Sequence, residues 1–372
     1  MRRERERVLV TGMGVVTPFG PGVERFWNGI VQNESRVGRH EEFVLPSGSL
    51  LSAPMPNEFV NDVVERYGGR RNAWAMDALL SEALGDTKLD GRGSVFFANA
   101  YNGDAYDDPQ LASREWRVDH WAEWLRAKTG AESASSILTA CSAANTAISL
   151  GTDWIAQRYC DWALVGAMEM LTPELIMTFD ALRMTSNTGC RPFAADHDGT
   201  VLGDGAGLLL LESEAHATAR GARVLAEVAA SSLMTDGGMG KLTEDGSVVK
   251  AMMMRALEQA HLAPSELDLI NAAATGGAAV DQLETRAIDA LFGADRPIVY
   301  SVKPLVGQSI GGTGAVEAVA TLLSLLKQEV PASLTDPRGR KHTRGARLET
   351  AFNNSIAMTG HMCTALFRRV QQ

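Results

Sequence analysis

The same succession of strand, turn and helix is predicted more than once along this chain, and the repetition strongly restricts the fold. Residues 137–158 predict a strand, a turn of small residues and a long helix of small residues, and a strand over 162–166 follows. From residue 299 the order returns as a strand over 299–303, a glycine-rich turn and a helix over 315–327. A related strand and helix lie within 267–291. Strands that alternate with helices favour parallel sheets with covered faces, so we predict an α/β fold of two similar halves with mixed, mainly parallel sheets.

We place the join between the halves near Gly221, so that the first half covers 1–222 and the second covers 223–372. No low-complexity linker lies there, and we expect the halves to pack as one body.

A strand over 8–18 contains Gly12 and Gly14, which indicate close backbone packing rather than nucleotide binding, because no helix begins directly after them. The other elements expected before residue 131 are a helix over 23–31, an irregular polar stretch to about 66, a helix over 73–84, a strand over 95–100 and an amphipathic helix within 103–130 with Trp116, Trp121 and Trp124, which should serve packing.

Cys141 lies where the chain is predicted to pass from a strand into a helix. The residues around it, Thr139-Ala140-Cys141-Ser142, combine a sharp turn with the start of a small-residue helix, an arrangement that presents a nucleophile. The positive end of the helix dipole favours a thiolate, so we expect this thiol to ionise more readily than a free one, whose pKa is about 8.5. Alternatively, Cys141 is only a small buried hydrophobic residue, as many cysteines are.

Composition argues against several classes of protein. The 372 residues carry a net charge of −10, and no long basic run is present, so we expect no nucleic-acid partner. The start of the chain lacks a signal-peptide pattern, and no run of about 18 apolar residues predicts a membrane span, so we expect a cytoplasmic protein. The four cysteines have no Cys-x-x-Cys spacing, which indicates neither a disulfide framework nor a zinc site. Cys160, Cys190 and Cys363 should be inert.

Motifs in a fixed order along nearly the whole chain resemble the β-ketoacyl-ACP synthases of fatty-acid and polyketide synthesis, of the ketoacyl synthase II type within the thiolase superfamily. The most specific piece is Arg191-Pro192-Phe193 together with residues 198–207, which read Asp-Gly-Thr-Val-Leu-Gly-Asp-Gly-Ala-Gly. The other matching pieces are residues 10–18, Thr139 to Ser142, Asp281 with Glu284, and Ser301-Val302-Lys303 through 311–318.

The resemblance implies the five-layered thiolase fold and a dimer formed through a sheet edge and helices. In the family, a cysteine takes an acyl chain from an acyl carrier protein or acyl-CoA. Two histidines then promote decarboxylation of a malonyl thioester and stabilise the enolate. Backbone N–H groups of the cysteine and of a glycine-rich loop bind the oxyanion. An acyl carrier protein is the implied partner, and no metal or organic cofactor is implied.

This chain departs from the family where the two histidines should stand. The family motif Asn-Ala-His-Gly-Thr reads Asn-Ala-Ala-Ala-Thr over 271–275, so Ala273 replaces the first histidine. In the second motif Gln308 replaces the other. Alanine cannot donate a hydrogen bond, and glutamine can donate one but cannot transfer a proton. We therefore expect that this chain alone does not carry out decarboxylative condensation.

Transferred position by position, the resemblance assigns catalytic positions to Cys141, Lys303, Glu317, Gln308 and Met358, and substrate-binding positions to Thr275, Ile356 and Ala273. Met358 and Ile356 lie in the loop 354–360, which keeps one glycine and has lost both phenylalanines of the family, and Gly277 replaces a second threonine near the pantetheine arm. Lys303 and Glu317 either support the site or form a structural ion pair. Gln308 either orients a thioester carbonyl or fills the volume of the histidine. His361 follows the loop and is either a substitute histidine or, as is more usual, a core or surface one.

Two hypotheses for function follow from these residues. In the first, the chain is a chain-length-factor type partner that shapes the acyl tunnel of a heterodimer with a complete ketosynthase. The missing histidines, the altered loop and the short stretch between residue 100 and Cys141 favour it. In the second, the chain is a stand-alone homodimer that uses Cys141 for acyl transfer, or for condensation or cyclisation without decarboxylation. The retained Cys141, Lys303 and Glu317 favour the second, since such partners usually lack the cysteine.

Overall fold

The computed structural model describes residues 5–45, 48–99, 119–237, 242–331 and 347–370. Its strands are β1 (Val8–Thr17), β2 (Gly20–Pro21), β3 (Gly38–Leu45), β4 (Gly48–Ala53), β5 (Gly93–Ala98), β6 (Ser133–Ser136), β7 (Trp162–Glu169), β8 (Leu202–Gly203), β9 (Gly205–Ser213), β10 (Ala226–Thr235), β11 (Leu269–Asn271), β12 (Ile298–Tyr300), β13 (Thr350–Ile356) and β14 (His361–Arg368). Its α-helices are α1 (Val23–Val31), α2 (Val60–Tyr67), α3 (Arg71–Leu84), α6 (His120–Thr129), α7 (Ala143–Ala156), α8 (Pro173–Ala181), α9 (Glu214–Ala219), α10 (Ser247–Gln259), α11 (Ala278–Phe292), α12 (Lys303–Val306) and α13 (Thr313–Lys327). Short 3-10 helices are η1 (Asn57–Phe59), η2 (Ala140–Ser142), η3 (Pro264–Glu266) and η4 (Ile310–Gly312).

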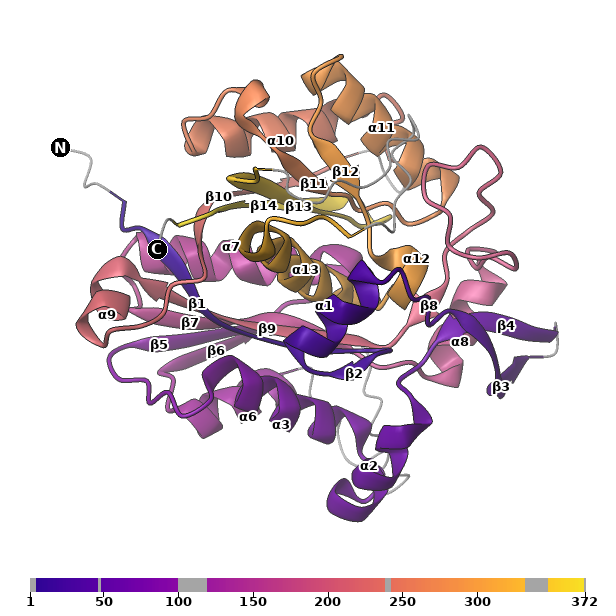
Figure 1. Cartoon of the computed structure of the whole chain (residues 1–372), viewed down its shortest axis with the longest axis horizontal. Helices are drawn as coiled ribbons and strands as arrows, with labels where there is room; N and C mark the ends of the chain where they lie inside the picture. Colours follow the sequence, from indigo (N-terminus) through magenta and orange to yellow (C-terminus); the bar gives the residue numbers. More distant parts are fainter. Residues whose placement is uncertain (1–4, 46–47, 100–118, 238–241, 332–346, 371–372) are drawn as a thin grey trace.

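Helices and sheet strands alternate in five layers, which confirms the predicted thiolase fold. Figure 1 shows α3 and α6 below one set of strands, α7 and α13 in the middle, and α10 and α11 above the second set. The packing agrees, since α7 contacts both β7 below it and β14 above it, and α13 contacts both β9 and β13. The central pair of helices is therefore covered by sheet on both sides, which accounts for their small and apolar residues.

All the main strands belong to one 11-stranded sheet in the order β12-β11-β13-β14-β10-β1-β9-β7-β5-β6, with β2 paired to β1. The first half supplies one end of this order and the second half the other. They join where β1 and β10 pair antiparallel through Leu9 with Glu227 and Val10 with Ala226. The sheet is mixed, as expected. Parallel pairs lie toward both ends, where β5 pairs with β6 and β7, and β11 pairs with β12 and β13, whereas the central pairs are antiparallel.

The predicted repetition is present at the backbone level. Ala140 has a φ of 50° and opens η2 before α7, and Ile310 has a φ of 43° and opens η4 before α13. The residues before them, Thr139 and Ser309, also have closely similar dihedral angles. The two turns face each other, because a Cβ on Gly311 would lie 3.9 Å from the carbonyl oxygen of Ala140. Cys141 and Gly311 thus occupy equivalent positions in the two halves.

Two expectations from the sequence were wrong in detail. The strand expected at residue 137 is the short polar strand β6, and the chain has left the sheet by Ile137, whose N–H still donates to the carbonyl of Phe97 at 3.1 Å. The polar stretch before residue 66 is not irregular, since it forms β3, β4 and α2. The strand β4 gains its second neighbour from β8 far along the chain, where Ser52 pairs with Leu202, and a local pattern does not reveal such a partner. Trp121 is buried, as its packing role requires, while Trp116 lies outside the described residues.

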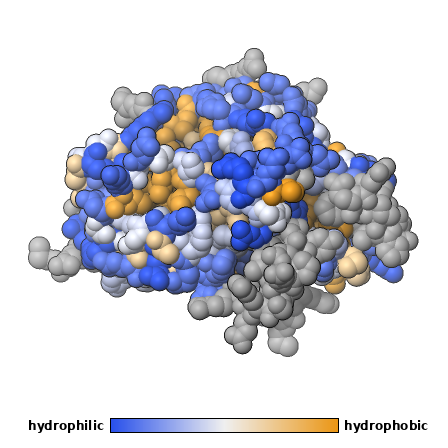
Figure 2. All heavy atoms as spheres, turned by 90° about the horizontal axis from the view of Figure 1, so that it is seen from below, coloured by the Kyte–Doolittle hydropathy of each residue, from blue (hydrophilic) through white to orange (hydrophobic). Residues whose placement is uncertain are grey.

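The face of the molecule in Figure 2 is largely hydrophilic, with some hydrophobic side chains reaching it. Figure 2 views the molecule from the side of α2, α3 and α6 in Figure 1 and shows a hydrophobic area bordered by hydrophilic residues. Elsewhere, large hydrophobic side chains that are exposed include Leu138, just after β6, and Met177 and Leu182, on or just after α8. Exposed side chains of this kind, when they gather near a functional site, mark interaction surfaces.

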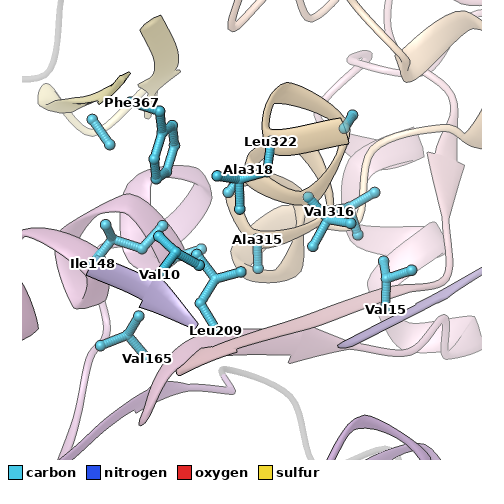
Figure 3. Close-up of a cluster of buried hydrophobic side chains, with 14 of the residues drawn as sticks. Val10, Val15, Ile148, Val165, Leu209, Ala315, Val316, Ala318, Leu322 and Phe367 are labelled. Carbon is cyan, nitrogen blue, oxygen red and sulfur yellow. The ribbon is translucent and has the colours of Figure 1, made fainter. Parts of the chain in front are cut away.

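The core between the two sets of strands is built around α13. Figure 3 shows Ala315, Val316, Ala318 and Leu322 of this helix facing a cluster that includes Val10, Val15, Ile148, Val165, Leu209 and Phe367. The segment Ile310–Lys327 is long and apolar enough to span a membrane by length and composition, but 89% of it is buried inside the protein. Burial on all sides explains why most residues of this helix are apolar, and its polar residues Glu317, Thr321 and Ser324 are buried as well.

Candidate active site

Cys141 is held in a constrained turn at the N-terminal end of α7. The preceding residue, Ala140, adopts the left-handed backbone region, which costs a non-glycine residue free energy and is common at functional sites. Side chains lock the turn, because the Ser142 hydroxyl donates to the Thr139 carbonyl at 2.8 Å and the hydroxyls of Thr139 and Thr146 lie 3.1 Å apart. These contacts hold Cys141 at the start of α7, and its role as a nucleophile stays a prediction.

Gln308 is the polar neighbour of the sulfur. Its side-chain Nε2 donates to Cys141 Sγ at 3.2 Å, and its Oε1 accepts from the hydroxyl of Thr200 at 3.3 Å. The backbone of Gln308 is also fixed, since its N–H donates to the Val201 carbonyl at 2.7 Å and its carbonyl accepts from Gly203 N–H at 3.0 Å. Gln308 therefore does more than fill the volume of a histidine, because it supplies a hydrogen-bond donor to the sulfur.

Apolar side chains form another part of the environment of Cys141. Cys141 is half-buried and packs against a buried apolar cluster, and Phe179 of α8 packs against the same cluster. The buried members of this cluster are Leu171, Leu175, Ile176, Leu202 and Ile310. An apolar setting of this kind suits an acyl chain, and the contribution of α8 was not apparent from the sequence.

The acidity expected for Cys141 was wrong in direction. Burial raises the pKa of the Cys141 thiol above its ordinary value, and this effect exceeds the opposing influence of the Lys303 ammonium and the Gln308 hydrogen bond. The N-terminus of α7 offers only a partial charge, whereas removing a thiolate from water costs much more. Lys303 and Gln308 both lower the pKa of the Cys141 thiol, so they offset part of the increase that burial causes.

Lys303 and Glu317 form a buried ion pair beside the site. The ammonium of Lys303, at the start of α12, contacts a carboxylate oxygen of Glu317 on α13, and both side chains are almost fully buried. Burial raises the pKa of Glu317 to about 7, against the attraction of Lys303. The pair joins α12 to α13, and the Lys303 ammonium opposes the effect of burial on the pKa of the Cys141 thiol. Whether the pair supports the site or is only structural stays a prediction.

The loop that holds Ala273 keeps a defined shape without the histidine. Buried Glu284 of α11 accepts hydrogen bonds from the N–H groups of Ala273 and Ala274, each at 3.0 Å, and from Asn354 Nδ2 at 3.1 Å. Ala274, where the family has glycine, has a φ of 31°. The methyl group of Ala273 lies in the same buried apolar cluster as Ile356 of β13. Ala273 therefore packs in an apolar cluster, and its side chain has no group that can transfer a proton.

Thr275 is held by the carboxylate of Asp281, which also contacts His197. Its hydroxyl donates to Asp281 Oδ1 at 3.4 Å and accepts from Gly277 N–H at 3.1 Å. The second oxygen of Asp281 lies 3.3 Å from Nδ1 of His197, which sequence reasoning did not single out. A role of Thr275 toward a pantetheine arm stays a prediction.

Met358 lies at the tip of the hairpin between β13 and β14 and is 49% exposed. The hairpin is tight, because Ala357 N–H donates to the His361 carbonyl at 2.8 Å and Gly360 N–H donates to the Ala357 carbonyl at 2.9 Å. Within the described ranges, no hydrogen bond joins Met358 to Cys141, so its catalytic assignment stays a prediction. His361 points its Nδ1 to the hydroxyl of Thr235 at 3.2 Å, which is an ordinary surface contact.

The other cysteines and the acidic groups suggest no second centre. Burial raises the pKa of Cys160 to about 11 and that of Cys190 to about 12, and it raises the pKa of Cys363 as well. Protonated, buried thiols of this kind are poor nucleophiles. Among the residues that the structure describes, no group of three or more His, Cys, Asp or Glu side chains could hold a metal ion.

The arrangement can be compared with known proteins. The model of the β-ketoacyl synthase N-terminal domain matches residues 132–217, and that of the β-ketoacyl synthase C-terminal domain matches residues 225–335. The putative polyketide beta-ketoacyl synthase 1 of Streptomyces cyaneus is 31% identical over 370 residues, which cover 87% of each chain. The chain belongs to the β-ketoacyl synthase family. This is a family of fatty-acid and polyketide biosynthesis, as the motifs predicted.

Further members of the β-ketoacyl synthase family share both its sequence and its fold with this chain. The 3-oxoacyl-[acyl-carrier-protein] synthase 2 of Mycobacterium tuberculosis is 29% identical over 97% of both chains. The structure of the ishigamide ketosynthase/chain length factor matches with a TM-score of 0.85 and 25% identity, over 99% of this chain and 100% of that one. A type II polyketide ketosynthase in complex with its acyl-carrier protein, bound to the hexaketide, matches with a TM-score of 0.84 and 26% identity, over 98% and 100% of the chains.

Proposed function

We propose that this β-ketoacyl synthase chain is a chain-length-factor type subunit that pairs with a complete ketosynthase and shapes its acyl tunnel. The observation that carries the proposal is the pair of residues at the histidine positions. Ala273 presents a methyl group within an apolar cluster, and Gln308 presents an amide to Cys141. Neither can give or take the proton that decarboxylative condensation requires. In the part of the chain that the structure describes, no histidine hydrogen-bonds to Cys141.

The surface near the site supports pairing with another chain. The strand β6 ends the order of the large sheet, so its outer edge has no neighbour among the described strands, and an open edge is a template for pairing. Leu138, two residues beyond β6, is 53% exposed. The ishigamide structure is a ketosynthase/chain length factor, which makes a heterodimer of two such chains a fitting assembly for this one. An acyl carrier protein is the partner that we infer for the assembly, from the relatives that act on or bind one.

The experiment is co-expression of this chain with a complete ketosynthase from the same gene neighbourhood, followed by native mass spectrometry. We expect a one-to-one heterodimer. Leu138→Asp should weaken it by about tenfold or more, because a charge would be placed in an apolar contact. Leu233→Asp is the matched control, since Leu233 is 41% exposed on β10 in the other half, and it should pair like the parent chain.

Two results would contradict the proposal. One is a chain that remains a homodimer in the presence of the complete ketosynthase. The other is a heterodimer that forms without any change in the length of the product made by the ketosynthase, because a subunit that shapes the tunnel must alter that length.

A second candidate is acyl transfer to Cys141, alone or before a condensation or cyclisation without decarboxylation. The contact between Gln308 Nε2 and Cys141 Sγ favours it, since a donor at 3.2 Å stabilises a thiolate. The thiolate would attack the carbonyl carbon of an acyl thioester, and the bond to the sulfur of the carrier would break. The carrier thiolate would leave and take a proton from water. This step needs no histidine in principle, and it is compatible with a role as a partner subunit.

A further inference from the structure

We propose that Thr200 is a positioning residue that sets which end of the Gln308 amide faces Cys141. A glutamine amide has a donor end and an acceptor end of nearly the same shape, so its effect on a thiol depends on its orientation. With Nε2 toward the sulfur it stabilises a thiolate, and with Oε1 toward the sulfur it repels one. The proposal deepens the second candidate function, acyl transfer to Cys141, because it names what prepares the sulfur for it.

The contacts of Gln308 leave one orientation favoured. Its Oε1 accepts from the Thr200 hydroxyl at 3.3 Å, and its Nε2 is thereby directed to Cys141 Sγ at 3.2 Å. A reversed amide would place Nε2 against the hydroxyl and Oε1 against the sulfur. The hydroxyl would then accept from Nε2, so its own proton would lose Oε1 as an acceptor, and Oε1 would repel the thiolate. Both Thr200 and Gln308 are almost fully buried, so water does not readily replace either partner.

The backbone fixes Thr200 as firmly as it fixes Gln308. Thr200 N–H donates to the Met184 carbonyl at 2.9 Å, and its carbonyl accepts from Ser186 N–H at 2.7 Å. Two residues further on, Leu202 of β8 forms an isolated parallel bridge with Gln308. The backbone of Thr200 therefore cannot move away from Gln308 without breaking main-chain contacts.

Cys190 also contacts the Thr200 hydroxyl and could compete for its proton. Burial raises the pKa of the Cys190 thiol to about 12, so this cysteine keeps its own proton at neutral pH. The Cys190 thiol donates its own proton to the Thr275 carbonyl, with the two atoms 3.6 Å apart, and a neutral thiol is only a weak acceptor. The hydroxyl proton then remains available for Oε1 of Gln308, which completes a directed path from Thr200 through the amide to Cys141.

The test is the rate at which iodoacetamide alkylates Cys141 between pH 6 and pH 10, followed by mass spectrometry of the Cys141 peptide. Thr200→Val keeps the side-chain shape and removes the hydroxyl. It should raise the apparent pKa of the thiol by about one unit and slow alkylation at neutral pH by about tenfold. Thr200→Ser keeps the hydroxyl and should react within about twofold of the parent. Thermal melting of each variant confirms that it is folded.

A double-variant comparison separates positioning from a general structural effect. In a Gln308→Ala background, Thr200→Val should change the alkylation rate by less than about twofold, because the amide through which it acts is gone. An unchanged pH profile in Thr200→Val, or an equal slowing with and without Gln308, would overturn the proposal. Alkylation needs neither a partner subunit nor a carrier protein, so this failure would leave the heterodimer experiment unaffected.

Discussion

Replacing Glu317 by alanine should lower the free energy of unfolding by about 3–5 kcal/mol, because it leaves a buried cation without its counter-ion. The ammonium of Lys303 contacts the Glu317 carboxylate, and the two side chains are 3% and 1% exposed. Removing one partner leaves the other charge in an apolar interior, where it has neither water nor a counter-ion. Urea unfolding, followed by circular dichroism at pH 8, measures the change.

Two comparisons make this prediction specific. Glu24→Ala removes an exposed partner of Lys327 and should cost about 1 kcal/mol or less. The double variant Lys303→Met/Glu317→Leu removes both charges and should recover much of the lost stability, since an apolar pair of similar volume replaces a buried ion pair at little net cost. A Glu317→Ala protein as stable as the parent would show that Lys303 and Glu317 are not the buried pair described.

The parent chain should form an acyl adduct with acyl carrier protein thioesters, and replacing Cys141 by alanine should abolish it. Cys141 is a half-buried residue, its sulfur has a hydrogen-bond donor in Gln308, and it packs against the apolar cluster that includes Phe179. We expect one acyl group per chain, measured by the mass of the intact protein after incubation with carriers of different acyl chain length. The adduct should disappear in Cys141→Ala, because no other described cysteine has comparable access.

Cys160→Ala is the matched control for the acylation experiment. Cys160 is buried in the first half with a pKa raised to about 11, so its removal should leave the adduct unchanged. An adduct that survives Cys141→Ala would place the acceptor elsewhere. A parent chain that takes no acyl group from any carrier would remove the second candidate function and leave the partner role.

The repeated unit could be predicted from the sequence because its signals are local. A run of small residues after Cys141 and a glycine-rich run before α13 both require close packing, and the two turns indeed share the positive φ of Ala140 and Ile310. The family motifs likewise placed Cys141, Gln308, Lys303 and Glu317, and the structure brings the first two into contact and the last two into an ion pair. Local patterns and motif order were sufficient for these features.

What the sequence did not reveal depends on residues that are far apart along the chain. Thr200 and Phe179 lie far from Gln308 and Cys141 in sequence, and only the fold brings each one to its neighbour. The strand before Cys141 was predicted too late in the sequence, because β6 is polar and does not look like a strand. Its pairing with β5, and not its composition, makes β6 a strand. The acidity of Cys141 was misjudged because the helix dipole can be read from sequence whereas the burial of the sulfur cannot.

The most direct test of the central claim is carbon dioxide released from a malonyl carrier protein, in the presence of an acyl carrier protein, by the purified chain alone. We expect no release above a reaction without the chain, because neither Ala273 nor Gln308 can transfer a proton. The variant Ala273→His/Gln308→His should release carbon dioxide at least about 10²-fold faster than the parent, since acid–base groups return to the site. Release by the parent chain that matches this variant would contradict the account and make the chain a complete condensing enzyme.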